Sequence, residues 1–114
     1  MKVSVAMRHG ELSEELRDLT ERRAQRLARF EARLGGVTIT FDEDRDRKRA
    51  EVRAGVEGDS PVVARAGGPT HRTALDRALD RAIRQLKRQR ERRRDLQREA
   101  PDIEVSDSEL PASS

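Results

Sequence analysis

Arginine is the residue type in this sequence that is best suited to act on a partner. Residues 81–98 contain nine basic side chains against two acids, Glu91 and Asp95. A guanidinium group is planar, stays charged at neutral pH and can bind two phosphate oxygens at once. A dense row of such groups predicts binding to a polyanion, and above all to an RNA backbone.

A second group of arginines lies between residues 17 and 33 and allows two interpretations. It consists of Arg17, Arg22, Arg23, Arg26, Arg29 and Arg33. The predicted helix that carries these arginines also holds the acids Glu14, Glu15, Asp18, Glu21 and Glu31. These acids could pair with the arginines on a solvated helix surface, so the segment either binds RNA or is an ordinary charged surface. The second interpretation is weaker for residues 81–98, where acids are sparse.

The sequence contains no pattern typical of catalysis or metal binding. His9 and His71 are not at metal-ligand spacing, cysteine is absent, and no nucleophile or phosphate-loop motif is present. We therefore expect no enzyme activity, no catalytic residue, no metal, no cofactor and no small-molecule substrate. Only 2% of residues are aromatic, and Phe30 and Phe41 fall on predicted core faces, so stacking on unpaired bases is scarcely available. A folded RNA surface is the expected partner.

Charge divides the chain into two parts. The net charge is +3, yet residues 1–98 carry every Lys and Arg, while residues 99–114 hold five acids and no base. We expect one basic domain over residues 1–98 and an acidic tail without regular structure over residues 99–114. No apolar run has the length of a signal peptide core or a membrane span, so we expect a soluble, cytoplasmic protein without membrane contact.

Hydrophobic periodicity predicts four strands and two helices. Alternating apolar residues indicate strands over residues 2–7, 37–41, 50–56 and 62–66, with a charged loop at 42–47. A first helix should begin after a Ser13 cap and run to about Leu34, where Gly35-Gly36 ends it. A second helix should begin after a Thr70 cap.

The second helix has an apolar stripe that ends at Leu86, although helix-favouring basic residues continue to Arg98. We expect this C-terminal half to have nothing to pack against and to project as an exposed cationic rod. The element order predicts an α+β fold, β-α-β-β-β-α, with a four-stranded, mainly antiparallel sheet and both helices packed on one face.

This order of elements and the basic second helix are similar to the ribosome hibernation promoting factor family, which includes ribosome-associated inhibitor A, or protein Y, in its short form. The resemblance covers residues 1 to about 97. It is carried by the segments Met1–Met7, Glu11–Arg17, Arg47–Val52, Ala74–Asp76, Leu79–Arg81 and Ile83–Arg88.

The resemblance implies a stress or stationary-phase factor that binds the small ribosomal subunit and its rRNA. Such a factor occupies the mRNA and tRNA channel, inhibits translation and stabilises inactive ribosomes. By position, the resemblance implies RNA binding by Arg23, Arg26, Arg81, Arg84, Arg88, Arg90 and Arg92. Lys87 and Arg94 are added from charge alone.

Two departures from the family pattern affect this interpretation. Thr70-His71-Arg72 stands where the family often has an Asp, an apolar residue and a Tyr. The C-terminal dimerisation domain of the long form is not found, so we expect a monomer when the protein is free. Two other functions stay open: a generic double-stranded-RNA-binding protein or RNA chaperone, and an interaction module whose acidic tail docks on the basic helix of another copy.

Overall fold

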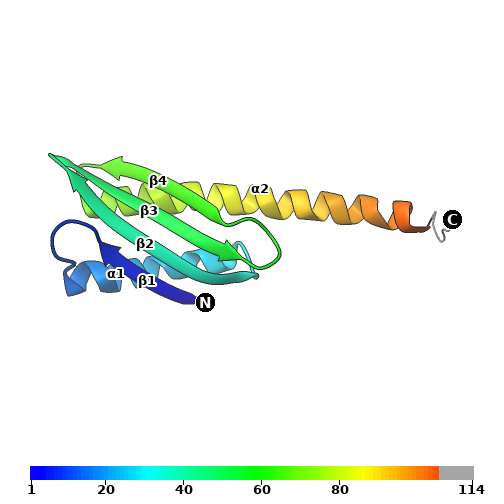
Figure 1. Ribbon diagram of the computed structural model, residues 1–114, viewed down its shortest axis with the longest axis horizontal. Helices are drawn as coiled ribbons and strands as arrows, with labels where there is room; N and C mark the ends of the chain where they lie inside the picture. Colours follow the sequence, from blue (N-terminus) through cyan, green and yellow to red (C-terminus); the bar gives the residue numbers. More distant parts are fainter. Residues whose placement is uncertain (106–114) are drawn as a thin grey trace.

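The structure, a computed structural model, describes the backbone of residues 1–105 and the side chains of residues 1–98. It contains, in order, β1 (Lys2–Met7), α1 (Glu14–Ala24), the 3₁₀ helix η1 (Gln25–Arg29), β2 (Leu34–Asp44), β3 (Arg47–Val56), β4 (Val62–Gly68) and α2 (His71–Val105). The predicted α+β fold and its β-α-β-β-β-α order are confirmed (Figure 1). In the described residues, no helix combines the length and the apolar character needed to cross a membrane.

The four strands form one mixed sheet in the order β1-β2-β3-β4. β1 pairs parallel to β2, with Val3 opposite Val37, whereas β2–β3 and β3–β4 pair antiparallel. The parallel pair follows from the connection, because α1 and η1 cross over between β1 and β2 and return the chain to the same end of the sheet. Both helices lie behind the sheet in Figure 1, which leaves its other face uncovered.

A small core fills the space between the sheet and the helices. In the strands β2, β3 and β4, every second residue is buried, among them Ile39, Val52 and Val62. The residues between them point to solvent. Leu75, Leu79 and the other apolar residues of the α2 stripe cover them from behind. Most of the core side chains are Ala, Val or Leu.

The first helix is shorter than the sequence predicted. Ser13 caps it as expected, since its hydroxyl accepts a hydrogen bond from the Leu16 amide at 3.1 Å. The α-helix ends at Ala24, however, and η1 ends at Arg29, so the prediction of a helix to Leu34 is wrong. Long-range contacts hold the following segment out of a helix: Glu31 binds a residue of α2, and the Arg33 carbonyl accepts from the Glu57 amide at 2.9 Å.

The second and third strands are longer than predicted, and the expected charged loop at 42–47 is mostly sheet. Asp42 faces Arg49, Glu43 faces Lys48 and Asp44 faces Arg47 across the β2–β3 pair. Opposite charges directly across an antiparallel ladder stabilise it, so acids and bases extend the hairpin to a two-residue turn at 45–46. Arg45 in this turn has a φ of +59°, in the left-handed region that disfavours side chains with a Cβ.

The second helix begins as predicted, with the Thr70 hydroxyl accepting from the Thr73 amide at 3.1 Å. The expectation that nothing packs beyond Leu86 is wrong for about two further turns, because Gln89 is buried and Arg93 binds the two acids Glu31 and Asp59. The remaining turns of α2 project past the sheet (Figure 1), and the molecule is therefore elongated, with extents of 62 × 23 × 20 Å along its principal axes. The backbone of α2 includes residues 99–105, where the predicted acidic tail begins, and residues 106–114 of that tail lie outside the described part of the chain.

Side chains of α2 also cover the free edge of β4. Donors spaced four residues apart bind successive backbone acceptors: Arg77 binds the Gly67 carbonyl, Arg81 binds that of Arg65, Gln85 that of Val63 and Gln89 that of Ser60. An open edge strand offers unpaired carbonyls to other chains, and this row of donors occupies them. The contacts also fix how α2 lies along the sheet.

Candidate nucleic-acid interface

The nine predicted RNA-binding residues divide into two groups in the structure. Three of them already bind other parts of the protein: Arg23, Arg26 and Arg81. Six are exposed on α2 and have no carboxylate within ion-pair distance in the described part of the chain: Arg84, Lys87, Arg88, Arg90, Arg92 and Arg94. The second group is the available cationic surface.

The two arginines of the first-helix region link the helices to each other. Arg23 binds Asp76 at 2.5 Å, and Arg26 lies 3.7 Å from Asp80. Their partners come from α2 and not from the acids nearby in sequence. Both side chains of the Arg26–Asp80 pair are well exposed, so the pair contributes no more than about 1 kcal/mol to the free energy of unfolding.

Arg81 has a structural role, since it donates to the backbone of β4. Lys87 also touches the protein: its ammonium nitrogen lies 4.9 Å from the centre of the Phe30 ring. A cation over an aromatic face is held there without losing its charge. Lys87 therefore stays able to bind an anion while it covers Phe30.

A buried ion-pair cluster around Arg93 sets the direction of the projecting half of α2, and no sequence pattern indicated this cluster. Arg93 binds Glu31, which precedes β2, and lies 2.7 Å from Asp59 in the β3–β4 turn. Only 3% of the Glu31 side chain is exposed. Its second carboxylate oxygen accepts from the Arg33 amide at 3.0 Å.

The surroundings of this cluster favour the charged forms of its two acids and of Arg93. Burial acts to raise the pKa of Glu31, but hydrogen bonds from Arg93 and the Arg33 amide, with the charges of both arginines, outweigh it and lower that pKa. The hydrogen bond from Arg93, followed by that from the Ser60 amide, lowers the pKa of Asp59. Both acids raise the pKa of Arg93. The cluster is thus ionised at neutral pH and fixes the base of the rod.

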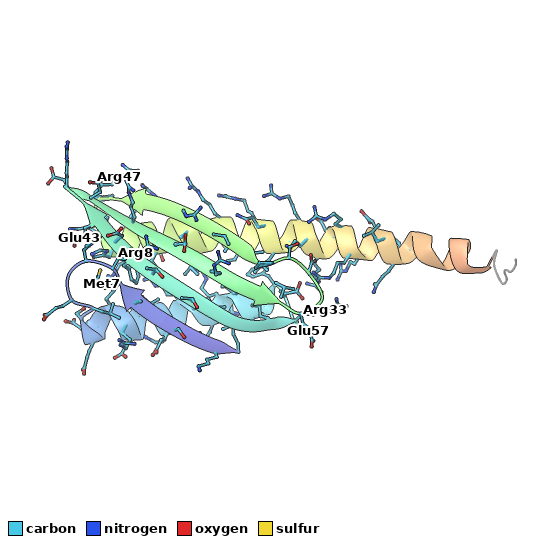
Figure 2. The ribbon with its side chains drawn as sticks, in the orientation of Figure 1. Met7, Arg8, Arg33, Glu43, Arg47 and Glu57 are labelled. Carbon is cyan, nitrogen blue, oxygen red and sulfur yellow. The ribbon has the colours of Figure 1, made fainter. Side chains whose placement is uncertain are left out.

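A basic groove runs beside this cluster, between α2 and the segment that follows η1. It has a volume of about 300 Å³, and its charged walls include Arg29, Arg33, Arg90 and Arg94. Because Arg93 already neutralises Glu31, the groove presents an excess of positive charge. Figure 2 shows Arg33 beside Glu57, at the end of the sheet from which α2 projects. Arg29 and Arg33 were not among the predicted site residues, although both belong to the arginine group between residues 17 and 33.

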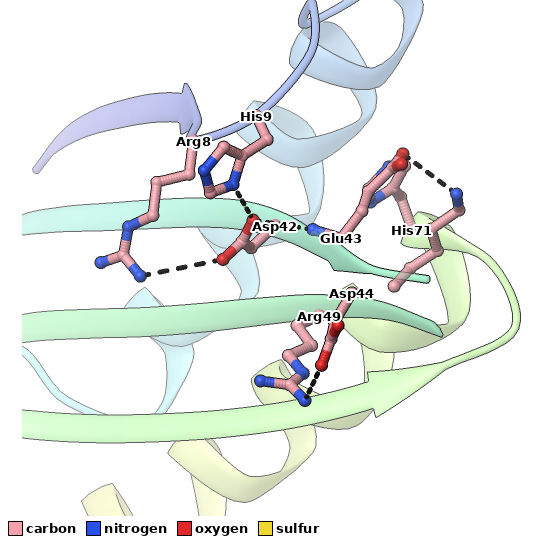
Figure 3. A network of polar contacts seen from close by, with 8 residues as sticks. Arg8, His9, Asp42, Glu43, Asp44, Arg49 and His71 are labelled. Atoms are coloured by element: carbon pink, nitrogen blue, oxygen red, sulfur yellow. Dashed lines mark hydrogen bonds and ion pairs between the residues drawn. The ribbon is translucent and has the colours of Figure 1, made fainter. Parts of the chain in front are cut away.

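The two histidines take part in a polar network at the other end of the sheet (Figure 3). His9 Nδ1 lies 2.7 Å from Asp42, and His71 Nε2 lies 3.1 Å from Glu43. His71 also packs edge-on against Phe41, with ring centres 5.4 Å apart. Hydrogen bonds from His9 and the Glu43 amide lower the pKa of Asp42, and those from Lys48 and His71 lower the pKa of Glu43.

His9 lies on the surface and His71 is the first residue of α2. Their contacts with Asp42 and Glu43 link the β2–β3 hairpin to the end of β1 and to the start of α2. Among the residues with described side chains, no three His, Asp or Glu residues come together as metal ligands.

Residues 3–94 match the family model described as sigma 54 modulation protein / S30EA ribosomal protein. The chain belongs to this family. A protein of the sigma 54 modulation / S30EA family is ribosome-associated, and the resemblance to ribosome hibernation factors drawn from the sequence is thereby confirmed. A search of curated proteins gave no match.

Two solved structures resemble this member of the S30EA family. The N-terminal domain of Thermus thermophilus Protein Y is 26% identical, with a TM-score of 0.69 over 77% of this chain and 98% of that one. A ribosomal subunit interface protein from Coxiella burnetii is 20% identical, with a TM-score of 0.69 over 79% of this chain and 98% of that one. The second likeness concerns the fold alone.

Proposed function

We propose that this protein binds the rRNA of the small ribosomal subunit in the cytoplasm, occupies the channel of mRNA and tRNA, and inhibits translation while it stabilises inactive ribosomes. Family membership and the likeness to Protein Y support the ribosome as the site of action. The observation that carries the RNA contact is the set of exposed basic side chains of α2 that lack a carboxylate partner in the described part of the chain.

The affinity comes mainly from the projecting half of α2. Arg84 and Arg88 lie one turn apart on the side of the helix away from the core, and Arg90 and Arg94 lie one turn apart along the basic groove. Two such rows can bind two phosphate tracks, as expected for a helix inserted between RNA walls. Arg23, Arg26 and Arg81 hold the helices and β4 together, so they contribute to the affinity for rRNA only indirectly.

The mechanism is exclusion, and it needs no catalytic group. A body 20–23 Å across, extended by a rod, fills space that a nucleic acid strand would otherwise occupy. Guanidinium groups bound to rRNA phosphates hold it there, and each contact releases condensed counterions. The free chain is a monomer in this account.

The test is co-sedimentation with purified small subunits, together with translation in vitro. Arg84→Glu/Arg88→Glu should lower the affinity by about 100-fold or more, because two charge-assisted contacts become repulsive. Arg17→Glu/Arg53→Glu is the matched control: it changes the net charge equally at exposed positions on α1 and β3. Equal co-sedimentation of the α2 variant and wild type would refute the assignment of α2.

A competition experiment separates this function from that of a generic duplex-RNA binder. Bound mRNA and tRNA should displace the protein from the small subunit, whereas free duplex RNA at the same concentration should not. Displacement by free duplex RNA alone would favour the generic function.

A further inference from the structure

The uncovered face of the sheet has a hollow of its own, far from the projecting part of α2. Its volume is about 370 Å³, and its charged lining consists of Arg8, Arg47, Arg49 and Arg65 with Asp42 and Glu51. Arg8, Arg49 and Arg65 each have a carboxylate partner in Asp42, Asp44 and Glu51, so Arg47 supplies the unbalanced positive charge of the hollow. Figure 2 shows Arg8 and Arg47 at the same end of the sheet, opposite to the end where Arg33 lies.

The strand register brings these side chains together. Asp42, Arg49 and Gly67 lie side by side across β2, β3 and β4. The next outward-facing row on the same strands contains Thr40, Glu51 and Arg65. Arg8 directly follows β1, and its amide donates to the Phe41 carbonyl at 2.9 Å, so it continues the first row.

The two carboxylates lie deeper than the arginines and orient them. Asp42 and Glu51 side chains are about one-quarter exposed, whereas Arg8 and Arg65 are well exposed. Glu51 accepts from Arg65 Nε at 2.7 Å, and no described contact uses the two terminal nitrogens of Arg65. Arg8 lies 4.0 Å from Asp42, as Figure 3 shows. The terminal nitrogens of Arg65 thus stay available to a ligand.

Arg47 is placed by a glycine. A Cβ added at Gly67 would lie 2.6 Å from Arg47 Nε, so the guanidinium rests directly on the β4 backbone, where a side chain would displace it. Arg47 has no carboxylate within ion-pair distance among the residues with described side chains. It is therefore a preplaced cation without a counter-charge, and preplacement lowers the entropic cost of binding.

We propose that this hollow binds the phosphate group of a nucleotide, with Arg47 as the main ligand and Arg8 and Arg65 beside it. Guanidinium groups match phosphate oxygens in geometry and charge. Ligand pockets have volumes of roughly 300–1,000 Å³, so the hollow has room for a sugar or base in addition to the phosphate. The nucleotide is either free or part of an RNA strand, and the site does not depend on the α2 contacts proposed above.

The experiment is an NMR titration of the full-length, backbone-labelled protein with three probes: inorganic phosphate, adenosine 5′-monophosphate and a short single-stranded RNA. We expect saturable shifts of the amides of Thr40, Arg49 and Gly67 that are shared by at least two probes. Tighter binding of the mononucleotide would identify the free nucleotide as the source, and tighter binding of the RNA would identify a strand. Absence of saturable shifts at this face with every probe would overturn the proposal.

Two variants test the role of Arg47, and one serves as control. Arg47→Gln removes the charge, and Gly67→Ala displaces the guanidinium while only its flexible end has to move. Each should weaken binding about tenfold, the effect of one lost charge-assisted contact. Arg53→Gln, an exposed position on the same face outside the hollow, should leave the affinity unchanged. Equal weakening by Arg53→Gln and Arg47→Gln would reduce the site to general surface charge and refute it.

Discussion

Replacing Arg93 by Met removes the counter-charge of a buried carboxylate and keeps an unbranched side chain of similar helix propensity. Glu31 would stay almost fully buried and keep only the Arg33 amide, at 3.0 Å, as a described hydrogen-bond partner. Breaking one side of a buried ion pair costs roughly 3–5 kcal/mol. Because the hydrogen bond from the Arg33 amide remains, we expect a loss at the lower end of this range, about 3 kcal/mol of unfolding free energy at pH 7.

The pH dependence of this loss follows from the direction of the pKa shifts. In wild type the pKa values of Glu31 and Asp59 are lowered on folding, so their stabilisation is present above their ordinary values of 4.5 and 3.8 and is lost as the pH falls through the folded values. In Arg93→Met, burial without a counter-charge should raise the pKa of Glu31, so acid favours folding. The difference between the two proteins should therefore shrink on acidification.

Urea unfolding followed by far-ultraviolet circular dichroism, at a series of pH values, measures both effects. The double variant Arg93→Met/Glu31→Gln is the control, since it removes the buried charge and should recover a substantial part of the lost stability. A loss below about 1 kcal/mol at pH 7, or one that grows towards low pH, would refute the description of the cluster.

Three further predictions concern the fold. Arg45→Gly should stabilise the protein by about 0.5–1 kcal/mol in urea unfolding, because glycine adopts the φ of +59° without strain; a loss would show that the turn needs the side chain. Arg81→Met/Gln85→Leu should cost about 1–3 kcal/mol and promote self-association in size-exclusion chromatography, since two β4 carbonyls lose their donors; an unchanged monomer would contradict a protective role for these donors. Ser13→Ala should cost about 1 kcal/mol through the lost cap of α1, and no change in the unfolding midpoint would exclude that cap.

The features that the sequence predicted well are those set by local patterns. Alternating residues such as Val37, Ile39 and Val52 mark their strands, and the caps Ser13 and Thr70 mark the helix starts. The β4 edge donors also lie at a regular spacing of four residues, from Arg77 to Gln89, so this signal was present in the sequence. Arg and Gln on a helix ordinarily indicate solvent exposure, so this spacing alone did not predict the bonds to β4.

The features that the sequence did not predict depend on partners far away in the chain. Glu31 and Arg93 are 62 residues apart, and their pairing explains both the early end of the first helix and the packing of α2 beyond Leu86. Asp76 and Asp80 likewise bind arginines across from α1 and η1, which no local pattern indicates. The β2–β3 extension was detectable, since the acids 42–44 mirror the bases 47–49 around the turn.

The predicted site residues show the same difference between local patterns and distant partners. Arg84, Arg88 and Arg92 are exposed as predicted, because nothing local or distant pairs with them in the described part of the chain. Their contact with rRNA stays a prediction. Arg81 was assigned from charge and family position, and only the packed structure reveals its bond to β4.

The salt dependence of binding to small ribosomal subunits tests the central claim most directly. Log affinity plotted against log salt concentration should fall steeply for wild type, and Arg84→Gln/Arg88→Gln should reduce the slope by about 2, one unit for each lost phosphate contact. Arg17→Gln/Arg53→Gln should leave the slope unchanged. A slope for the α2 variant equal to that of wild type would contradict the conclusion that the outward arginines of α2 bind rRNA phosphates.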